Sequence, residues 1–367
     1  MKKKITAFLF LLFLVGMAVA GLVKPDRSFS EQENRYLQTW PGISAASVAD
    51  GSFMSRLETY LTDQSPLRDG MVRLHNSLLR WTGRREIQQV YFAPENRLIQ
   101  LYDTNLTQAR QNMEWINRWA EAWQGTQPIS LVLAPTAAVV YRDQLPECNL
   151  GYDAEALTAM LQVGVSPDIR LVDLQAVMQE HRQEAIYFRS DHHWTMRGAL
   201  YAWQILQPEA AKRTYEAWTA SDTFRGSLYS QAPTLGYPTE AVELYHVGEA
   251  ARMDVPARNI QDHELIWTEE LAHKDQYKAF MGDNYAEMII RNPEAPERSL
   301  LLFKDSYANA LLPFLAENYR TIYVLDLRYY RQSPTAYAKE RAVDEIMFLY
   351  NTDFFCTDNN FVWLTAE

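Results

Sequence analysis

The sequence predicts an α/β protein whose mostly parallel central sheet is covered by helices on both faces. Beyond residue 105, compact apolar strands alternate with amphipathic helices, and alternation of this kind is typical of three-layer α/β sandwiches. The strands are compact, largely apolar runs such as 129–133 and the continuous apolar run 300–303, as expected for strands buried on both faces. With 367 residues, 47% of them hydrophobic, the chain has enough apolar material for a large core.

The individual elements follow from the spacing of apolar residues. Residues 52–81 are predicted to form two helices, because apolar residues recur at helical spacing and Pro66 interrupts them. Residues 89–92 and 98–101 are predicted to be short strands. The elements expected after them are helix 106–124, strand 129–133, helix 153–163, strand 169–172, helix 174–184, a helix in 199–206, strand 300–303, helix 308–317, strand 322–325, helix 336–343 and strand 346–349. Residues 207–298 are hard to place and are predicted to hold insertions around the active face.

The N-terminus has the composition of a signal peptide or a membrane anchor. Lys2, Lys3 and Lys4 precede an uncharged apolar run that extends to Val23, which is long enough to span a bilayer. The small residues that end at Ala20 also fit a signal-peptidase site. We therefore expect a signal or anchor over 1–23, a helical extension over 24–88, an α/β domain over 89–367, and a location outside the cytoplasmic membrane.

Charge and cysteine content exclude several classes of protein. The formal charge is −11, from 46 acidic and 35 basic residues, which disfavours binding to a nucleic-acid backbone. The only cysteines are Cys148 and Cys356, so a multi-bridge disulfide framework and a thiolate zinc cluster are excluded. In an exported protein these two residues could form one bridge that closes a very long loop.

Two polar segments follow predicted strands, where ligands bind in a parallel sheet. One contains Asp191, His192 and His193 and precedes a helix that Thr195 can cap. The other places Ser306 on a turn between a buried strand and a helix. A serine needs a base and the base needs an orienting carboxylate, so these residues suggest Ser306 as nucleophile, His193 as base and Asp191 as orienter.

Simpler interpretations stay open for the same residues. An Asp-Ser pair before a helix is often only a helix cap. The histidine pair could belong to a loop that is stabilised by ring stacking. Asp191, His192 and His193 could also bind a metal ion, although no HExxH motif or second acidic cluster supports that interpretation. We therefore expect no resident metal or cofactor.

The motifs resemble those of a known family. Asp-His-His-Trp at 191–194 is similar to the signature of the DHHW proteins of Gram-positive bacteria, which are related to the SGNH-hydrolase-like domain of the alginate O-acetylation proteins. Residues 29–35 and 63–68 resemble the N-terminal motifs of the family, and residues 304–309 resemble its serine motif. The resemblance covers nearly the whole chain after the N-terminal apolar run and implies an SGNH-hydrolase-like three-layer sandwich.

The family's functional residues fall on specific positions. The family aspartate, histidine and serine correspond to Asp191, His193 and Ser306, so that His192 takes the variable middle position. Residues 281–285 resemble a Gly-Gly-Asn-Tyr segment in which Asp283 replaces the second glycine. The resemblance thus makes Asn284 a candidate oxyanion donor and Gly282 its neighbour in the site, although a plain turn remains an equal alternative.

Other residues near the motifs are candidates for contact with substrate. Arg328 follows a predicted strand and could line the same face of the sheet. Trp194 and Tyr307, together with Tyr329 and Tyr330, could offer stacking surfaces to a sugar ring, with burial in the core as the alternative.

The resemblance implies a function as well. We expect a serine-dependent O-acetyltransferase that acts on a cell-surface or exported polysaccharide and receives acetyl groups through a membrane-bound O-acyltransferase. Two alternatives are a carbohydrate O-acetyl esterase and a non-catalytic glycan-binding or envelope-assembly protein on the same fold.

Overall fold

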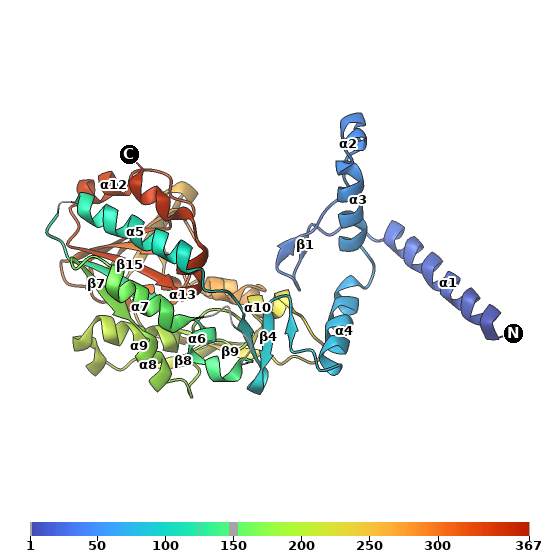
Figure 1. Cartoon of the computed structure of the whole chain (residues 1–367), viewed down its shortest axis with the longest axis horizontal. Helices are drawn as coiled ribbons and strands as arrows, with labels where there is room; N and C mark the ends of the chain where they lie inside the picture. Colours follow the sequence, from blue (N-terminus) through green and yellow to red (C-terminus); the bar gives the residue numbers. More distant parts are fainter. Residues whose placement is uncertain (1, 124, 147–152, 367) are drawn as a thin grey trace. The chain divides into compact units, whose positions relative to one another are not determined.

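The computed structural model describes residues 2–123, 125–146 and 153–366. These residues form two compact units (Figure 1). The first unit contains residues 1–88 together with 229–237, and the second contains 89–228 and 238–367. Residues 229–237 thus pack with the first unit, although they lie within the second in sequence.

The second unit is built on an eight-stranded sheet. Its strands, in spatial order, are β11 (Ile260–Glu264), β10 (Arg252–Val255), β12 (Glu287–Arg291), β14 (Thr321–Leu325), β13 (Ser299–Lys304), β15 (Glu345–Asn351), β6 (Ile129–Ala134) and β7 (Ile169–Asp173). The strands from β14 to β7 run parallel, whereas β12, β10 and β11 are antiparallel. The sheet is therefore mixed, and the prediction of a mostly parallel sheet holds only for its five-stranded part.

Helices cover both faces of this sheet. One face carries α6 (Ala137–Val140), α8 (Gln175–Glu180), α9 (Met196–Leu206) and α11 (Ala308–Leu315). The other carries α5 (Leu106–Trp123), α7 (Ala154–Gly164), α12 (Pro334–Arg341) and α13 (Thr352–Thr357). Successive residues of β13 point to opposite faces of the sheet. Leu302 therefore packs in the core under α9 and α11, and Phe303 packs in the core under α5 and α13. This alternation is why the central strands are apolar throughout.

Smaller strand pairs accompany the sheet. The hairpin of β4 (Val90–Ala93) and β5 (Arg97–Gln100) and the ribbon of β8 (Ala217–Phe224) and β9 (Glu240–Tyr245) are antiparallel. Further short elements include β1 (Phe29–Ser30), β2 (Arg35–Tyr36), β3 (Glu86–Ile87), α2 (Ala45–Ala49) and α10 (Ser227–Gln231).

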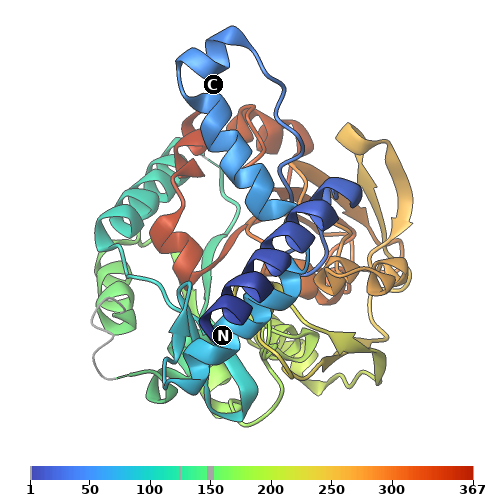
Figure 2. The same cartoon turned by 90° about the vertical axis from the view of Figure 1, so that its right-hand side faces the viewer.

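The first unit begins with α1 (Lys2–Val23). Among the described residues, α1 is the one helix long and apolar enough to cross a bilayer, with a mean hydropathy of 2.1 over Lys4–Gly21. A signal sequence has the same properties, so this helix fits either assignment. Two further helices, α3 (Ser52–Asp63) and α4 (Arg68–Trp81), follow in the lighter blue part of the chain (Figure 1, Figure 2).

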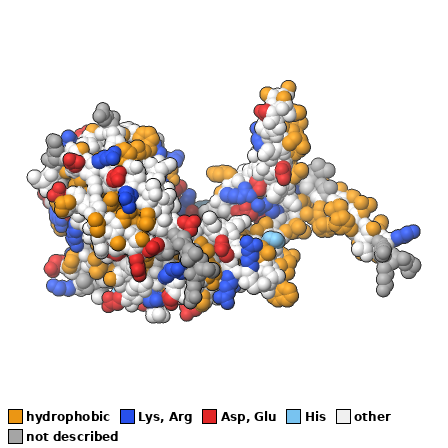
Figure 3. All heavy atoms as spheres, in the orientation of Figure 1, with side chains coloured by type: hydrophobic (Ala, Val, Ile, Leu, Met, Phe, Trp, Pro, Cys, Tyr) orange, Lys and Arg blue, Asp and Glu red, His pale blue; other side chains and the backbone are white. Residues whose placement is uncertain are grey.

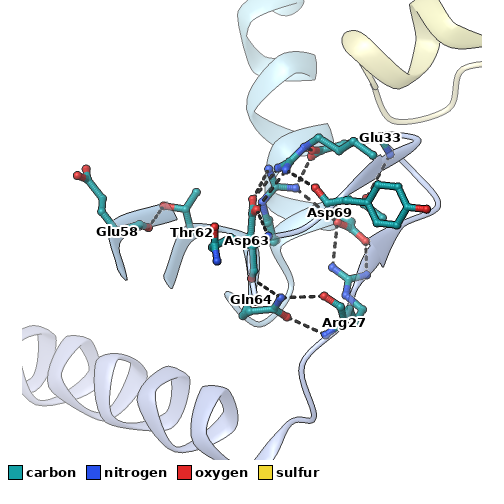
Figure 4. A network of polar contacts seen from close by, with 12 residues as sticks. Arg27, Glu33, Glu58, Thr62, Asp63, Gln64 and Asp69 are labelled. Atoms are coloured by element: carbon teal, nitrogen blue, oxygen red, sulfur yellow. Dashed lines mark hydrogen bonds and ion pairs between the residues drawn. The ribbon is translucent and has the colours of Figure 1, made fainter. Parts of the chain in front are cut away.

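The two N-terminal motifs bind one another. Arg35 of the first donates to both carboxylate oxygens of Asp63 in the second, over 2.6 and 3.1 Å, and Arg68 pairs with Glu33 (Figure 4). Gln64 is hydrogen-bonded to the backbone of Arg27 in both directions, over 3.0 and 2.9 Å. We call these residues, together with Asp69, the polar clasp. The clasp fastens the segment after α1 to the turn between α3 and α4.

Loss of Asp63 should destabilise the first unit. The Asp63 side chain is 3% exposed and also accepts from the Gln38 amide, so we expect Asp63→Ala to reduce stability by about 2 kcal/mol. Hydrogen exchange of residues 24–38 and 52–81 measures the effect. Glu58→Ala, on an exposed residue of the same helix, is the matched control and should change little.

The same carboxylate gives this stability a pH dependence. Burial alone would raise the pKa of Asp63, but the Arg35 hydrogen bonds and the Gln38 amide outweigh it and lower the pKa. The clasp therefore contributes fully above about pH 4 and loses its contribution as the pH falls through the lowered folded pKa. Equal protection of residues 24–38 in wild type and Asp63→Ala would contradict this role.

Candidate active site

Ser306 lies on the turn between β13 and α11, at the carboxyl edge of the parallel strands. The neighbouring Asp305 fixes this turn. Its buried carboxylate accepts from the Tyr307 amide over 2.8 Å, and from the amide and side chain of Asn351 over 2.7 Å each. Because Asn351 ends β15, the serine turn is tied to the next strand of the sheet.

The structure brings Ser306, His193 and Asp191 into one hydrogen-bonded chain. Nε2 of His193 lies 2.7 Å from Oγ of Ser306, and Nδ1 lies 2.6 Å from Oδ1 of Asp191. An ionised carboxylate only accepts hydrogen bonds, so it selects the tautomer with the proton on Nδ1. Nε2 is then free to accept the proton of the serine hydroxyl.

The carboxylate of Asp191 is buried and held from several sides. Oδ2 accepts from the Ser227 amide over 2.7 Å, and Oδ1 accepts from the His193 amide over 3.0 Å. Gly226 allows this approach, because a Cβ there would lie 2.3 Å from Cβ of Asp191. Burial alone would raise the pKa of Asp191, but the charges of His192 and His193 and the hydrogen bonds lower it. Asp191 therefore remains ionised and keeps His193 oriented.

A second carboxylate anchors the loop that carries Asp191. Glu240, at the start of β9, accepts from the amides of Arg189 and Ser190 over 2.7 and 2.8 Å. The Ser190 hydroxyl also donates to Glu240 and accepts from the Gly226 amide. Glu240 thus connects the loop to the β8–β9 ribbon.

Tyr277 supports the base and the nucleophile together. Its ring stacks on His193 with 3.7 Å between centroids and 6° between planes. Its hydroxyl donates to the carbonyl of Ser306 over 3.0 Å. No motif or periodic pattern pointed to Tyr277, which lies in the stretch 207–298.

His192 lies beside the triad rather than within it. Its Nδ1 is 2.7 Å from Oγ of Ser227, and 41% of its side chain is exposed. Single ligand atoms of Asp191, His192 and His193 lie within 4.8 Å of one another, close enough for a metal site. However, both nitrogens of His193 are engaged by Asp191 and Ser306, so metal binding would have to break this chain. The hydrogen bonds therefore favour the triad.

Two residues expected to contact substrate are instead buried. Trp194 and Tyr307 are each 0% exposed. The Trp194 indole donates to the Tyr307 carbonyl over 2.9 Å, and the Tyr307 hydroxyl donates to the His192 carbonyl. They lock the histidine and serine segments together, and the prediction that they line a sugar site is wrong. Tyr330 is also buried, whereas Tyr329 is 52% exposed.

The candidate oxyanion donor Asn284 is held by a buried lysine. Nζ of Lys304, which is 0% exposed, donates to Oδ1 of Asn284 over 2.9 Å and to Oδ1 of Asn309 over 2.5 Å. Because an ammonium group only donates, it fixes the amide oxygens towards itself. Within the described chain, Nδ2 of Asn284 has no protein acceptor, so this donor is available to a ligand.

Gly282 and Arg328 have structural partners. Gly282 has φ +75°, and a Cβ there would lie 2.9 Å from the ring of Trp267, so glycine is needed for this turn. Arg328 forms a bidentate pair with the buried Asp326, through Nε to Oδ1 at 2.9 Å and Nη2 to Oδ2 at 2.5 Å. The Arg328 charge is thereby compensated within the protein, although 21% of its side chain faces solvent.

Cys356 packs in the core away from this site. Cys356 is buried, and burial raises the pKa of its thiol to about 12. Cys148 lies outside the described residues, and the predicted bridge between the two stays a prediction.

Comparison with known proteins identifies the family. The DHHW protein family model matches residues 109–325, more than half of the chain. The chain belongs to the DHHW family. A DHHW family protein from Eubacterium siraeum has a similar structure, with a TM-score of 0.65 and 23% identity over 77% of this chain and 96% of that one.

A second protein has a similar fold. Bacillus cereus PatB1 aligns with a TM-score of 0.61 and 22% identity, over 74% of this DHHW chain and 98% of PatB1. PatB1 with a sulfonyl adduct aligns with a TM-score of 0.62 and 19% identity, over 75% and 97% of the two chains. The sequence matches none of the curated proteins compared with it.

Proposed function

We propose that this DHHW protein is an SGNH-hydrolase-like, serine-dependent acyltransferase that moves O-acetyl groups onto a cell-surface or exported polysaccharide. The observation that carries the proposal is the unbroken hydrogen-bonded chain Asp191–His193–Ser306. In such a chain, the base activates the serine without a metal or cofactor.

The reaction would proceed in two halves. As Oγ of Ser306 attacks the acetyl carbonyl, its proton moves to Nε2 of His193. The tetrahedral intermediate then collapses, and the donor alcohol leaves with that proton, so that an acetyl-serine remains. In the second half, His193 takes the proton of a sugar hydroxyl as its oxygen attacks the acetyl-serine. Collapse of this intermediate releases the acetylated sugar and returns the proton to Ser306.

The negative charge on the tetrahedral oxygen needs a donor in place before the reaction. Nδ2 of Asn284 is suited to this task, since Lys304 holds the other end of the amide. Loss of one such donor typically costs about 10² to 10³ in kcat. Lys304 would then act as a positioning residue through Asn284.

Lys304→Met tests this role. We expect kcat to fall by about 10- to 100-fold with KM little changed, because the Asn284 amide can rotate but is still present. In an Asn284→Ala background the same substitution should cost almost nothing more. Lys278→Met, on a partly exposed lysine that pairs with Asp283, is the matched control. Additive losses in the double variant would show that Lys304 does not act through Asn284.

The proposed location is supported by the N-terminus, and the proposed partners by the family resemblance. The apolar helix α1 supports a position outside the cytoplasmic membrane, released or anchored. A membrane-bound O-acyltransferase would supply acetyl groups, and the polysaccharide would accept them. No part of the proposed function requires nucleic acid.

Direction of transfer is decided by mass spectrometry of oligosaccharides incubated with an acetyl donor and the protein, against Ser306→Ala. Acetylated sugar that depends on Ser306 is the expected result. Donor cleavage without acetylated sugar, across a panel of acceptors, would instead identify an esterase. No cleavage by a well-folded protein would favour a glycan-binding or envelope-assembly protein.

A further inference from the structure

We propose that exposed apolar residues of α3 and α4 dock onto the surface of an anionic phospholipid bilayer, beside the point where α1 leaves it. This inference rests on the membrane anchoring included in the proposed function. The residues concerned, which we call the apolar face, are Met54, Leu61, Met71, Leu74, Leu78 and Trp81.

A helix on the surface of a soluble protein normally buries its apolar residues and exposes its polar ones, whereas α4 exposes apolar residues. Along α4 the members of the apolar face recur at helical spacing and are 50–85% exposed, from Leu74 at 50% to Trp81 at 85%. The packed side of α4 instead holds Asn76, which is 4% exposed and donates to the Pro233 carbonyl over 2.9 Å. An apolar stripe that faces solvent across two helices requires a partner.

The two helices border a hollow of about 1060 Å³. Met54 and Leu61 of α3 and Met71 of α4 line it, together with Leu57 and Val72. The hollow is open to solvent. Acyl chains are fluid and can fill a cavity of this irregular shape.

The polar clasp holds this face close to the anchor. Arg27 lies four residues after Val23, the last residue of α1, so the intervening chain spans at most about 14 Å. At Arg27 the chain is hydrogen-bonded to Gln64 through both its amide and its carbonyl, and the Arg27 guanidinium pairs with Asp69 over 2.9 Å. The turn between α3 and α4 must therefore stay near the membrane surface whenever α1 spans the bilayer.

The charges beside the apolar face favour anionic lipid. Although the whole chain carries −11, this segment has Arg56 in α3, Arg73 in α4, and Arg84 and Arg85 shortly after α4. Arg56, Arg84 and Arg85 are exposed and Arg73 is half-buried. Figure 3 shows Lys and Arg side chains beside hydrophobic ones in this part of the chain. Two of the nearby acidic residues, Asp63 and Asp69, are neutralised by Arg35 and Arg27 in the clasp. Apolar residues combined with arginines are typical of helices that lie in the membrane interface. Each arginine near an anionic surface strengthens binding about fivefold.

An environment-sensitive fluorophore on the full-length protein tests the proposal. The label is placed at Leu78→Cys in a Cys148→Ser background, with Val163→Cys as the matched control, since Val163 is an 89% exposed apolar residue of α7. The protein is reconstituted into vesicles of phosphatidylcholine alone or with phosphatidylglycerol, and flotation reports whether α1 holds it there. We expect the Leu78 label to shift to shorter wavelength and to be quenched by spin-labelled lipid, most strongly with phosphatidylglycerol. The Val163 label should do neither.

Two variants separate the contributions. Arg73→Gln with Arg85→Gln should reduce the preference for phosphatidylglycerol by about 25-fold. Met71→Gln with Leu74→Gln should reduce lipid quenching of the Leu78 label. Turnover of p-nitrophenyl acetate in detergent should be unchanged in both. The proposal would be overturned if the Leu78 label in floated vesicles stayed as water-exposed as the Val163 label. It would also be overturned if the Leu78 label became shielded from water only when a membrane protein was added to the vesicles. If the protein does not float with the vesicles, anchoring by α1 is rejected. If the labelled protein docks but has no esterase or transferase activity, only the acyltransferase function is rejected.

Discussion

Ser306→Ala is expected to lower the turnover of p-nitrophenyl acetate by about 10⁵- to 10⁶-fold, the loss seen when a serine nucleophile is removed from a triad. The hydroxyl is the atom that bonds to the acetyl carbon, and within the described site no other nucleophile lies within hydrogen-bonding distance of Nε2 of His193. Steady-state hydrolysis measures the loss of turnover, and mass spectrometry shows whether the acetyl-enzyme still forms.

The substitution should leave the fold intact. Ser306 makes its side-chain hydrogen bond to His193, whereas the turn itself is held by Asp305 and its partners on Tyr307 and Asn351. The thermal midpoint should therefore be nearly unchanged. Residual turnover within tenfold of wild type, by a folded Ser306→Ala protein, would end the assignment of Ser306 as nucleophile.

His193→Ala should cause a loss of similar size, because the serine then has no base to take its proton. Since the two residues act as one unit, the double variant Ser306→Ala with His193→Ala should be no slower than either single variant. The initial rate of acetyl-ester hydrolysis, corrected for the uncatalysed reaction, is the measurement.

His192→Ala is the matched control on the adjacent histidine. Its hydrogen bond to Ser227 lies outside the triad, so its loss should cost no more than about tenfold. Equal losses at both positions, restored by added metal ions, would support the metal site formed by Asp191, His192 and His193 instead of the triad.

The antiparallel edge of the sheet is where the sequence was least informative. The central strands were predictable because runs such as Ile129–Ala134 are apolar at every position except Ser130. By contrast, β10 and β12 are only four and five residues long, too short for their alternation of buried and half-exposed residues to stand out in the sequence. β12 becomes a strand by pairing with β14, and β10 by pairing with β12 and β11, all of which lie in other segments of the chain.

The sequence by itself determined the residue types of the site and their positions at strand ends, because Asp191, His193 and Ser306 stand in short motifs after apolar runs. It also indicated the parallel core and the apolar N-terminal helix.

Only the tertiary structure decided which residues support the site and which do not reach substrate. Tyr277, Glu240 and the Gly226 turn come from a region with no periodic signal, and Trp194 and Tyr307 look identical in sequence whether they face a sugar or the core. These outcomes depend on contacts between residues tens to more than a hundred positions apart. The spacing of residue types along the sequence does not indicate such contacts.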